Sequence, residues 1–216
     1  MGRLRFLTHR KAPPQTQRWQ RSRGRAVEGE LARGASFFPD GRNLLFYRRG
    51  PETASDLWLL SLEGKREPVP FLRTAFTEVL ATVSPDGRFV AYTSDESGRW
   101  EVYIVPYPGP GRKWRVSTDG GEEPIWARSG RELFYRFGGK WMVVPVTLGA
   151  GLSVGQPRVL FEGPYINVPG FSYDVAPDAQ RLLVIKGTQQ QVRQTRIEVV
   201  LNWFEEIKPR LSSAEQ

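Results

Sequence analysis

The chain has 216 residues, no cysteine and a formal net charge of +8. This length suffices to bury a substantial core as one all-β domain. The lack of cysteine excludes disulfides, zinc–thiolate and iron–sulfur sites, and thiol nucleophiles. Aromatic residues at 12%, with 22 Gly and 17 Pro, indicate many short strands separated by tight turns rather than long helices.

The positive charge is concentrated in residues 1–34. This segment has nine basic and two acidic residues, so it carries seven of the eight net positive charges. A basic arm could bind phosphates, but this one has almost no apolar periodicity, which is typical of a solvated, disordered leader. We therefore predict a disordered leader over 1–34 and expect no nucleic-acid partner. The basic residues are Arg3, Arg5, Arg10, Lys11, Arg18, Arg21, Arg23, Arg25 and Arg33.

No apolar run in the sequence reaches the length of a membrane span. The longest covers residues 141–146, whereas a spanning helix needs about 20 apolar residues. The Arg-rich start also lacks the apolar centre of a secretory signal. The sequence as it stands therefore predicts a soluble chain.

A turn-and-strand pattern occurs four times. Residues 36–47 (SFFPDGRNLLFY) are echoed by 83–92 (VSPDGRFVAY), 126–135 (WARSGRELFY) and 175–184 (VAPDAQRLLV). The copies follow one another at intervals of 46, 43 and 49 residues, and a four-stranded propeller blade needs roughly 40 to 50. The sequence thus predicts an all-β fold, a β-propeller of about four four-stranded blades. Their approximate bounds are 35–78, 79–122, 123–168 and 169–208, followed by a disordered tail over 209–216.

The repeated motif has the chemistry of a hairpin turn. Proline presets φ, the Asp carboxylate accepts nearby backbone N–H groups, and glycine adopts a positive φ at little cost. We therefore interpret these residues as structural rather than catalytic or metal-binding. The predicted turn residues are Pro39, Asp40, Gly41, Pro85, Asp86, Gly87, Ser129, Gly130, Pro177 and Asp178.

Each turn is followed by short apolar runs that predict further strands. In the second repeat these cover residues 89–93, 100–105 and 113–117; residues 56–62 and 140–146 match the middle run in the first and third repeats. Residues 100–105 are largely apolar on both faces, as expected where blades stack face to face. Residues 106–111 and 148–155 are rich in Pro or Gly and predict loops at the rim.

The end of the chain predicts a strand over 195–201 and a short helix over 202–207. Asn202 is the expected N-cap, and Glu205 falls at the third helical position, as in a capping box.

The repeats resemble TolB-type or WD-like propeller repeats, of the PD40 type, over residues 35–190. The ending VVLNWFEE, residues 199–206, resembles the C-terminus of bacterial membrane-anchored serine/threonine protein kinases that carry such a propeller. That resemblance implies an extracytoplasmic sensing domain, preceded in the family by a kinase domain and a membrane helix. The chain contains neither and has few blades for a closed ring, so we expect a fragment. The third and fourth turns depart from the family pattern, since Arg128-Ser129 replaces Pro-Asp and Ala179 replaces Gly.

The sequence offers little to support catalysis. The only histidine, His9, lies in the leader, so a hydrolytic triad has no base among the repeats, and none of the kinase motifs occurs. Two acidic pairs, at residues 95–96 and 122–123, could hold calcium or act as an acid and base, but we interpret them as solvated loop charge. We predict no catalytic residue, no cofactor and no metal.

Three functions remain open. The first is a binding or sensor module that recognises a protein, a peptide or a small ligand on the propeller and serves a larger signalling protein such as a kinase. The second is an accessory propeller of a prolyl-oligopeptidase-like hydrolase. The third is a truncated, non-functional remnant whose open blade edges favour self-association.

Overall fold

A computed structural model gives the fold and describes residues 33–50, 54–109, 111–149, 151–186 and 196–200. All of them belong to one compact unit, residues 31–216. These ranges contain strands and turns but no helix, and hence no helix long and apolar enough to cross a membrane. The predicted terminal helix over 202–207 and the tail over 209–216 lie outside the described residues, as does nearly all of the leader.

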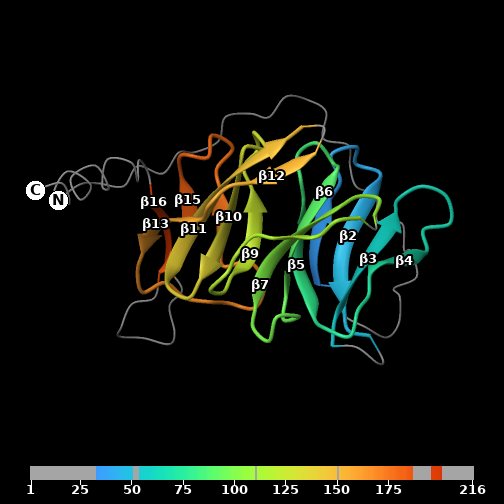
Figure 1. The fold of residues 1–216 in the computed structure, drawn as a ribbon, viewed down its shortest axis with the longest axis horizontal. Helices are drawn as coiled ribbons and strands as arrows, with labels where there is room; N and C mark the ends of the chain where they lie inside the picture. Colours follow the sequence, from blue (N-terminus) through green and yellow to red (C-terminus); the bar gives the residue numbers. More distant parts are fainter. Residues whose placement is uncertain (1–32, 51–53, 110, 150, 187–195, 201–216) are drawn as a thin grey trace, which may run out of the picture. The chain divides into compact units, whose positions relative to one another are not determined.

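The first two antiparallel sheets each have four strands in simple up-and-down order (Figure 1). Neighbours in sequence are therefore neighbours in the sheet, which short hairpin connections allow. The first sheet is β1 (Arg33–Phe37), β2 (Asn43–Arg48), β3 (Asp56–Ser61) and β4 (Pro68–Leu72). The second is β5 (Glu78–Val83), β6 (Phe89–Ser94), β7 (Glu101–Pro106) and β8 (Trp114–Arg115).

The third sheet departs from the predicted pattern. Its strand β11 is nine residues long and pairs along one edge with both β12 and β13. The prediction of a rim loop over 148–155 is therefore wrong, because β12 forms inside it. In the described ranges the fourth sheet has three strands. The strands are β9 (Glu122–Trp126), β10 (Glu132–Phe137), β11 (Lys140–Leu148), β12 (Leu152–Val154), β13 (Arg158–Glu162), β14 (Tyr173–Val175), β15 (Leu182–Lys186) and β16 (Arg196–Val200).

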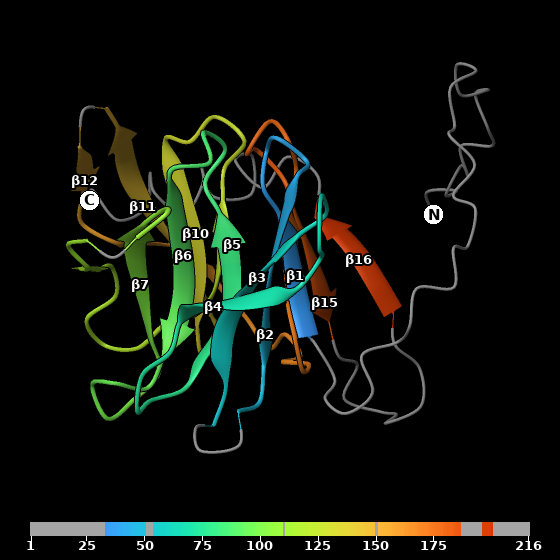
Figure 2. The same ribbon diagram turned by 90° about the vertical axis from the view of Figure 1, so that its right-hand side faces the viewer.

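The sheets stack in chain order, with their first strands brought together. β5 contacts β1 on one side and β9 on the other, and β9 also contacts β14. Figures 1 and 2 show the second sheet lying between the first and the third. This is the arrangement of propeller blades, in which the first strand of each blade lies nearest the axis.

The core consists of three apolar layers, one between each pair of successive sheets. In β7, Val102 and Ile104 pack into the layer shared with the third sheet, whereas Tyr103 and Val105 pack into the layer shared with the first. All four are buried. The prediction that this strand is covered on both faces is therefore confirmed, and each fully buried side chain of this size contributes about 1.5–3 kcal/mol. The third layer holds Phe134, Trp141, Leu182 and Val184.

The four predicted hairpin turns share one geometry. The N–H groups of Gly41, Gly87, Gly130 and Ala179 donate to the carbonyl three residues earlier, at 2.8–2.9 Å. All four residues have positive φ, from 56° at Ala179 to 74° at Gly87. The two turns that depart from the family motif therefore close like the others, although Ala179 adopts a left-handed conformation that costs a non-glycine residue about 1 kcal/mol.

Candidate functional site

A cleft of about 510 Å³ lies where the first three sheets and the connection into the fourth converge. The first three sheets and the connection into the fourth line it: Tyr47 comes from the first, Thr93 from the second, Glu122 from the third, and residues 167–170 from the connection between β13 and β14. The cleft is at the starts of β5 and β9, and the turns closed by Gly87 and Gly130 are at the other ends of these strands. Convergence of several blades on one concave site is the arrangement in which ligand sites commonly form.

A β-bulge repeated in the first strands shapes this end of the molecule. In each of β1, β5 and β9, two residues stand opposite one residue of the neighbouring strand. The first bulged residues are Gly34, Leu80 and Glu123, with φ of 53°, 52° and 58°. A left-handed residue at this position bends the strand and redirects its side chains. Leu80 and Glu123 keep the conformation without being glycine, and both line the cleft.

Glu123 is held by a buried polar network that joins three sheets. Its carboxylate accepts hydrogen bonds from the backbone N–H of Ser172, at 2.6 Å, and from the Ser172 hydroxyl, at 2.7 Å to the same oxygen. The Arg136 guanidinium lies 3.9 Å from the other carboxylate oxygen of Glu123. The Glu123 N–H donates to the hydroxyl of Thr93, and its carbonyl accepts from the hydroxyl of Tyr173. Glu123 is 1% exposed and therefore serves to hold the sheets together.

Arg136 is the cation at the centre of this network and is itself buried. Its guanidinium donates to the carbonyls of Gly138, Tyr165 and Ile166 and to the Ser172 hydroxyl. Burial raises the pKa of the Glu123 carboxyl, although Ser172 and Arg136 partly oppose the shift.

Glu122 differs from its neighbour because no described residue donates a hydrogen bond to its carboxylate or forms an ion pair with it. It is half-buried and lines the cleft. Burial raises the pKa of its carboxyl, and the nearby charge of Glu123 adds to the rise. A half-buried carboxylate without a partner is stabilised by a ligand that brings a positive charge, because the ligand replaces the water lost on burial.

The rest of the described lining suits a cation with an apolar stem. Trp100 is 38% exposed, and aromatic faces attract cationic groups. Asn167 adds an amide, and no basic side chain is present among the described lining residues. The cleft therefore has the chemistry to bind an ammonium or guanidinium group.

The structure places the predicted site residues in the turns that follow the first strand of each sheet. The turns stay separate from one another and do not form one site. Asp40, Asp86, Ser129 and Asp178 each accept a hydrogen bond from the backbone N–H two residues later, at 2.9–3.3 Å. Within each turn the side chain thus caps its own backbone.

The interpretation of both acidic pairs as solvated loop charge needs correction. Glu122 and Glu123 belong to β9, and Glu123 is buried because Ser172 and Arg136 supply partners that are distant in sequence. Asp95 lies in a turn, but its carboxylate accepts from the N–H and hydroxyl of Thr77. The described residues contain no cluster of three or more acidic or histidine side chains suited to a metal ion.

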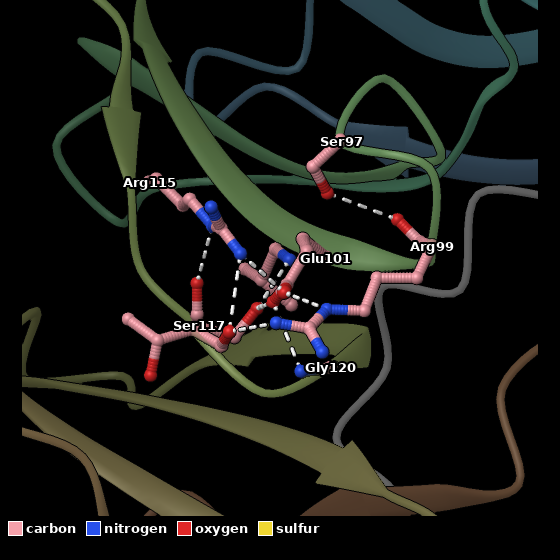
Figure 3. Close-up of polar contacts among 8 residues, drawn as sticks. Ser97, Arg99, Glu101, Arg115, Ser117 and Gly120 are labelled. Atoms are coloured by element: carbon pink, nitrogen blue, oxygen red, sulfur yellow. Dashed lines mark hydrogen bonds and ion pairs between the residues drawn. The ribbon is translucent and has the colours of Figure 1, made fainter.

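A second buried carboxylate, Glu101, went unnoticed in the sequence. It accepts hydrogen bonds from Arg99 at 2.9 Å, from Arg115 at 2.6 Å and from the N–H of Gly120 at 3.2 Å, as well as from the Ser117 hydroxyl (Figure 3). Burial alone would raise the pKa of this carboxyl, but these donors outweigh it and lower the pKa. The sequence signal that could have revealed this site is the placement of two arginines and one glutamate on adjacent predicted strands: Arg99 and Glu101 lie at the start of the strand over 100–105, and Arg115 lies in the strand over 113–117.

No protein-family model matches the chain, and no curated protein matches it. Solved structures do match. TolB from Acinetobacter baumannii superposes with a TM-score of 0.57 and 16% identity, over 78% of this chain and 40% of that one. Nidogen, in a nidogen/laminin complex, gives a TM-score of 0.57 and 12% identity, over 81% and 62%. The fold is a TolB-like β-propeller.

A third propeller neighbour is an enzyme, a puromycin-hydrolyzing peptidase of Mycobacterium tuberculosis. It has a TM-score of 0.57 and 18% identity, over 80% of this chain and 30% of that one. This chain thus spans less than two thirds of each of the three proteins. At these identities the similarity establishes the fold, and it confirms the predicted propeller. The resemblance to kinase propellers stays a prediction.

Proposed function

We propose that the chain is a non-catalytic propeller module that binds a protein, peptide or small ligand through a cationic group held in the cleft by Glu122. The observation that carries this proposal is the half-buried Glu122, whose carboxylate has no described partner and which stands in a cleft lined by three sheets and the connection into the fourth. The chemical class follows from the carboxylate and the exposed face of Trp100, since both attract an ammonium or guanidinium group.

Two further observations support binding rather than chemistry as the role of the cleft. The one other carboxylate in the described lining, Glu123, is committed to the network with Ser172 and Arg136. The only histidine of the sequence, His9, belongs to the leader segment. A general acid or base must lie within hydrogen-bond reach of a reacting group, and the described lining of the cleft holds no histidine and no uncommitted second carboxylate that could act together with Glu122.

The experiment is a titration of the protein with capped tripeptides, Gly-Arg-Gly and Gly-Lys-Gly, followed by nitrogen–proton correlation NMR. We expect the indole resonance of Trp100 to shift with the cationic peptides and not with Gly-Gln-Gly. Glu122→Gln should weaken binding about fivefold or more, because it removes the charge and keeps the shape.

Glu67→Gln is the matched control, since Glu67 is exposed and does not line the cleft. It should leave the affinity unchanged. Equal affinity of the wild type and Glu122→Gln for the arginine peptide would overturn the proposal.

The resemblance of residues 199–206 to kinase C-termini supports a finer proposal, that the module senses a ligand for a serine/threonine protein kinase outside the cytoplasm. An antibody raised against the propeller tests it on native cells. A band much heavier than the 24.6 kDa of this chain, in the membrane fraction and with kinase activity after immunoprecipitation, is the expected result. A soluble band at the mass of the chain would contradict it.

A further inference from the structure

A second groove, of about 470 Å³, lies between the outer edges of the second and third sheets. One wall is the segment Arg112, Lys113, Trp114 and Arg115, which includes β8. The other wall is formed by residues 152–157, which include β12. This groove shares no described residue with the cleft around Glu122.

The charge of the groove is positive. Arg112, Lys113 and Arg115 line it, and its described lining has no acidic residue. Arg115 is paired with buried Glu101 (Figure 3), and Lys113 is paired with Glu96. Arg112 has no carboxylate partner among the described residues; its guanidinium lies 5.5 Å from the centre of the Trp114 ring. At least one full positive charge is therefore available to a ligand.

Both walls are edge strands. β8 is the last strand of the order β5-β6-β7-β8, and β12 ends the order of the third sheet. The edge of a sheet presents backbone N–H and C=O groups that can pair with another chain. Between the edges, Val116 and Leu152 are buried in the core layer shared by the two sheets, and Trp114 and Val154 pack against that layer. The groove thus combines an apolar floor, free backbone edges and positive charge.

We propose that this groove binds an extended acidic peptide segment of a partner protein, which adds as a strand to the free edge of β8. Side chains of a strand point alternately to opposite faces. Apolar side chains at every second position would contact the apolar floor, and an acidic side chain between them would reach Arg112, which has no carboxylate partner among the described residues. This mode of recognition takes its affinity from main-chain hydrogen bonds and its specificity from the alternating side chains.

The observations favour a peptide over a nucleic acid. Two of the three cations already have carboxylate partners, which leaves a local charge rather than a stripe that follows a phosphate backbone. The edge backbone of β8 is the feature that a peptide can use and a polyphosphate cannot.

The experiment measures fluorescence polarisation of a labelled peptide, Glu-Val-Glu-Val-Glu, with the purified chain at low salt. We expect binding that weakens as salt increases. Arg112→Glu should lower the affinity about fivefold or more, since it reverses the unpaired charge. Peptides methylated on alternate backbone nitrogens, and the lysine analogue Lys-Val-Lys-Val-Lys, should not bind.

The control variants separate this site from other charges. Arg128→Glu, at an exposed turn residue, should leave binding unchanged, and so should Glu122→Gln, which tests the other site. Far-ultraviolet circular dichroism should be the same for all variants. Equal binding to Arg112→Glu, retained affinity of the methylated peptides, or tighter binding of a single-stranded oligonucleotide than of the peptide would each overturn the proposal.

Discussion

Glu78 and Glu101 are both completely buried in the second sheet, one at the start of β5 and the other at the start of β7. Glu101 meets two guanidinium groups, a hydroxyl and a backbone N–H (Figure 3). Glu78 accepts a hydrogen bond from the Thr74 hydroxyl on one oxygen, whereas its other oxygen is buried with no partner among the described residues.

The pKa values of the two carboxyls move in opposite directions. Burial raises the pKa of Glu78 to about 7, with Thr74 opposing the rise and the charge of Asp56 adding to it. Burial acts on Glu101 as well, but its donors lower the pKa below the ordinary value. The comparison teaches that burial sets the cost of a charge, and that partners from other strands decide whether the charge is kept.

The largest effect is expected for Glu101→Ala. The substitution leaves Arg99, Arg115, Ser117 and the N–H of Gly120 without their shared acceptor, so we expect a loss of about 3 kcal/mol in the free energy of unfolding. Urea denaturation measures it. Glu96→Ala is the matched control, because it breaks the single ion pair with exposed Lys113 and should cost less than about 1 kcal/mol. Similar losses for both variants would contradict the comparison.

A pH-dependent effect is expected for Glu78→Gln. Because the pKa of Glu78 in the folded protein lies above its ordinary value of 4.5, the folded state binds more protons than the unfolded state between that value and about 7. The contribution of Glu78 to stability is therefore fully present below about pH 4.5 and is lost as the pH rises through about 7. The glutamine variant should be about 2 kcal/mol more stable than the wild type near pH 8, and similar to it near pH 4.5.

Urea denaturation across this pH range provides the measurement. Glu101 affects the pH dependence of stability in the opposite direction, because its pKa is lowered in the folded protein. Its contribution to stability is present above the ordinary carboxyl pKa and is lost as the pH falls through the lowered pKa. It adds no slope between about pH 5 and about pH 8. The contrary result would be a wild-type stability that increases between about pH 5 and about pH 8, with the same pH dependence in Glu78→Gln. It would show that Glu78 is not the group that titrates.

The smallest effect is expected for Arg99→Ala. The side chain of Arg99 is 53% exposed, so water screens its attraction to Glu101, and Arg115 still holds the carboxylate. We expect a loss of about 0.5 kcal/mol, measured as a small decrease in Tm with unchanged circular dichroism. A loss as large as that of Glu101→Ala would mean that Arg99 alone keeps the carboxylate ionised.

The fold was accessible from the sequence because its determinants are local or periodic. The Pro39-Asp40-Gly41 and Pro85-Asp86-Gly87 turns close with bonds between residues two or three apart. The strand over 100–105 has apolar side chains on both faces, so both faces must pack against other sheets, whichever sheets those are. The rim loop over 148–155 was mispredicted because Gly-rich sequence did not reveal that β12 would pair with the extended β11.

The sequence by itself determined the blade period, the turn positions and the two-faced strands, because these depend on φ preferences and on the alternation of side chains along a strand. The tertiary structure alone decided the fate of the carboxylates. Glu123 is paired because Ser172 and Arg136 reach it from segments distant in sequence, Glu122 is left facing the cleft, and Glu78 is buried with no counter-charge among the described residues. The electrostatic environment of a charge depends on which non-local groups the fold brings within a few ångströms, and that information is not written in the neighbouring residues.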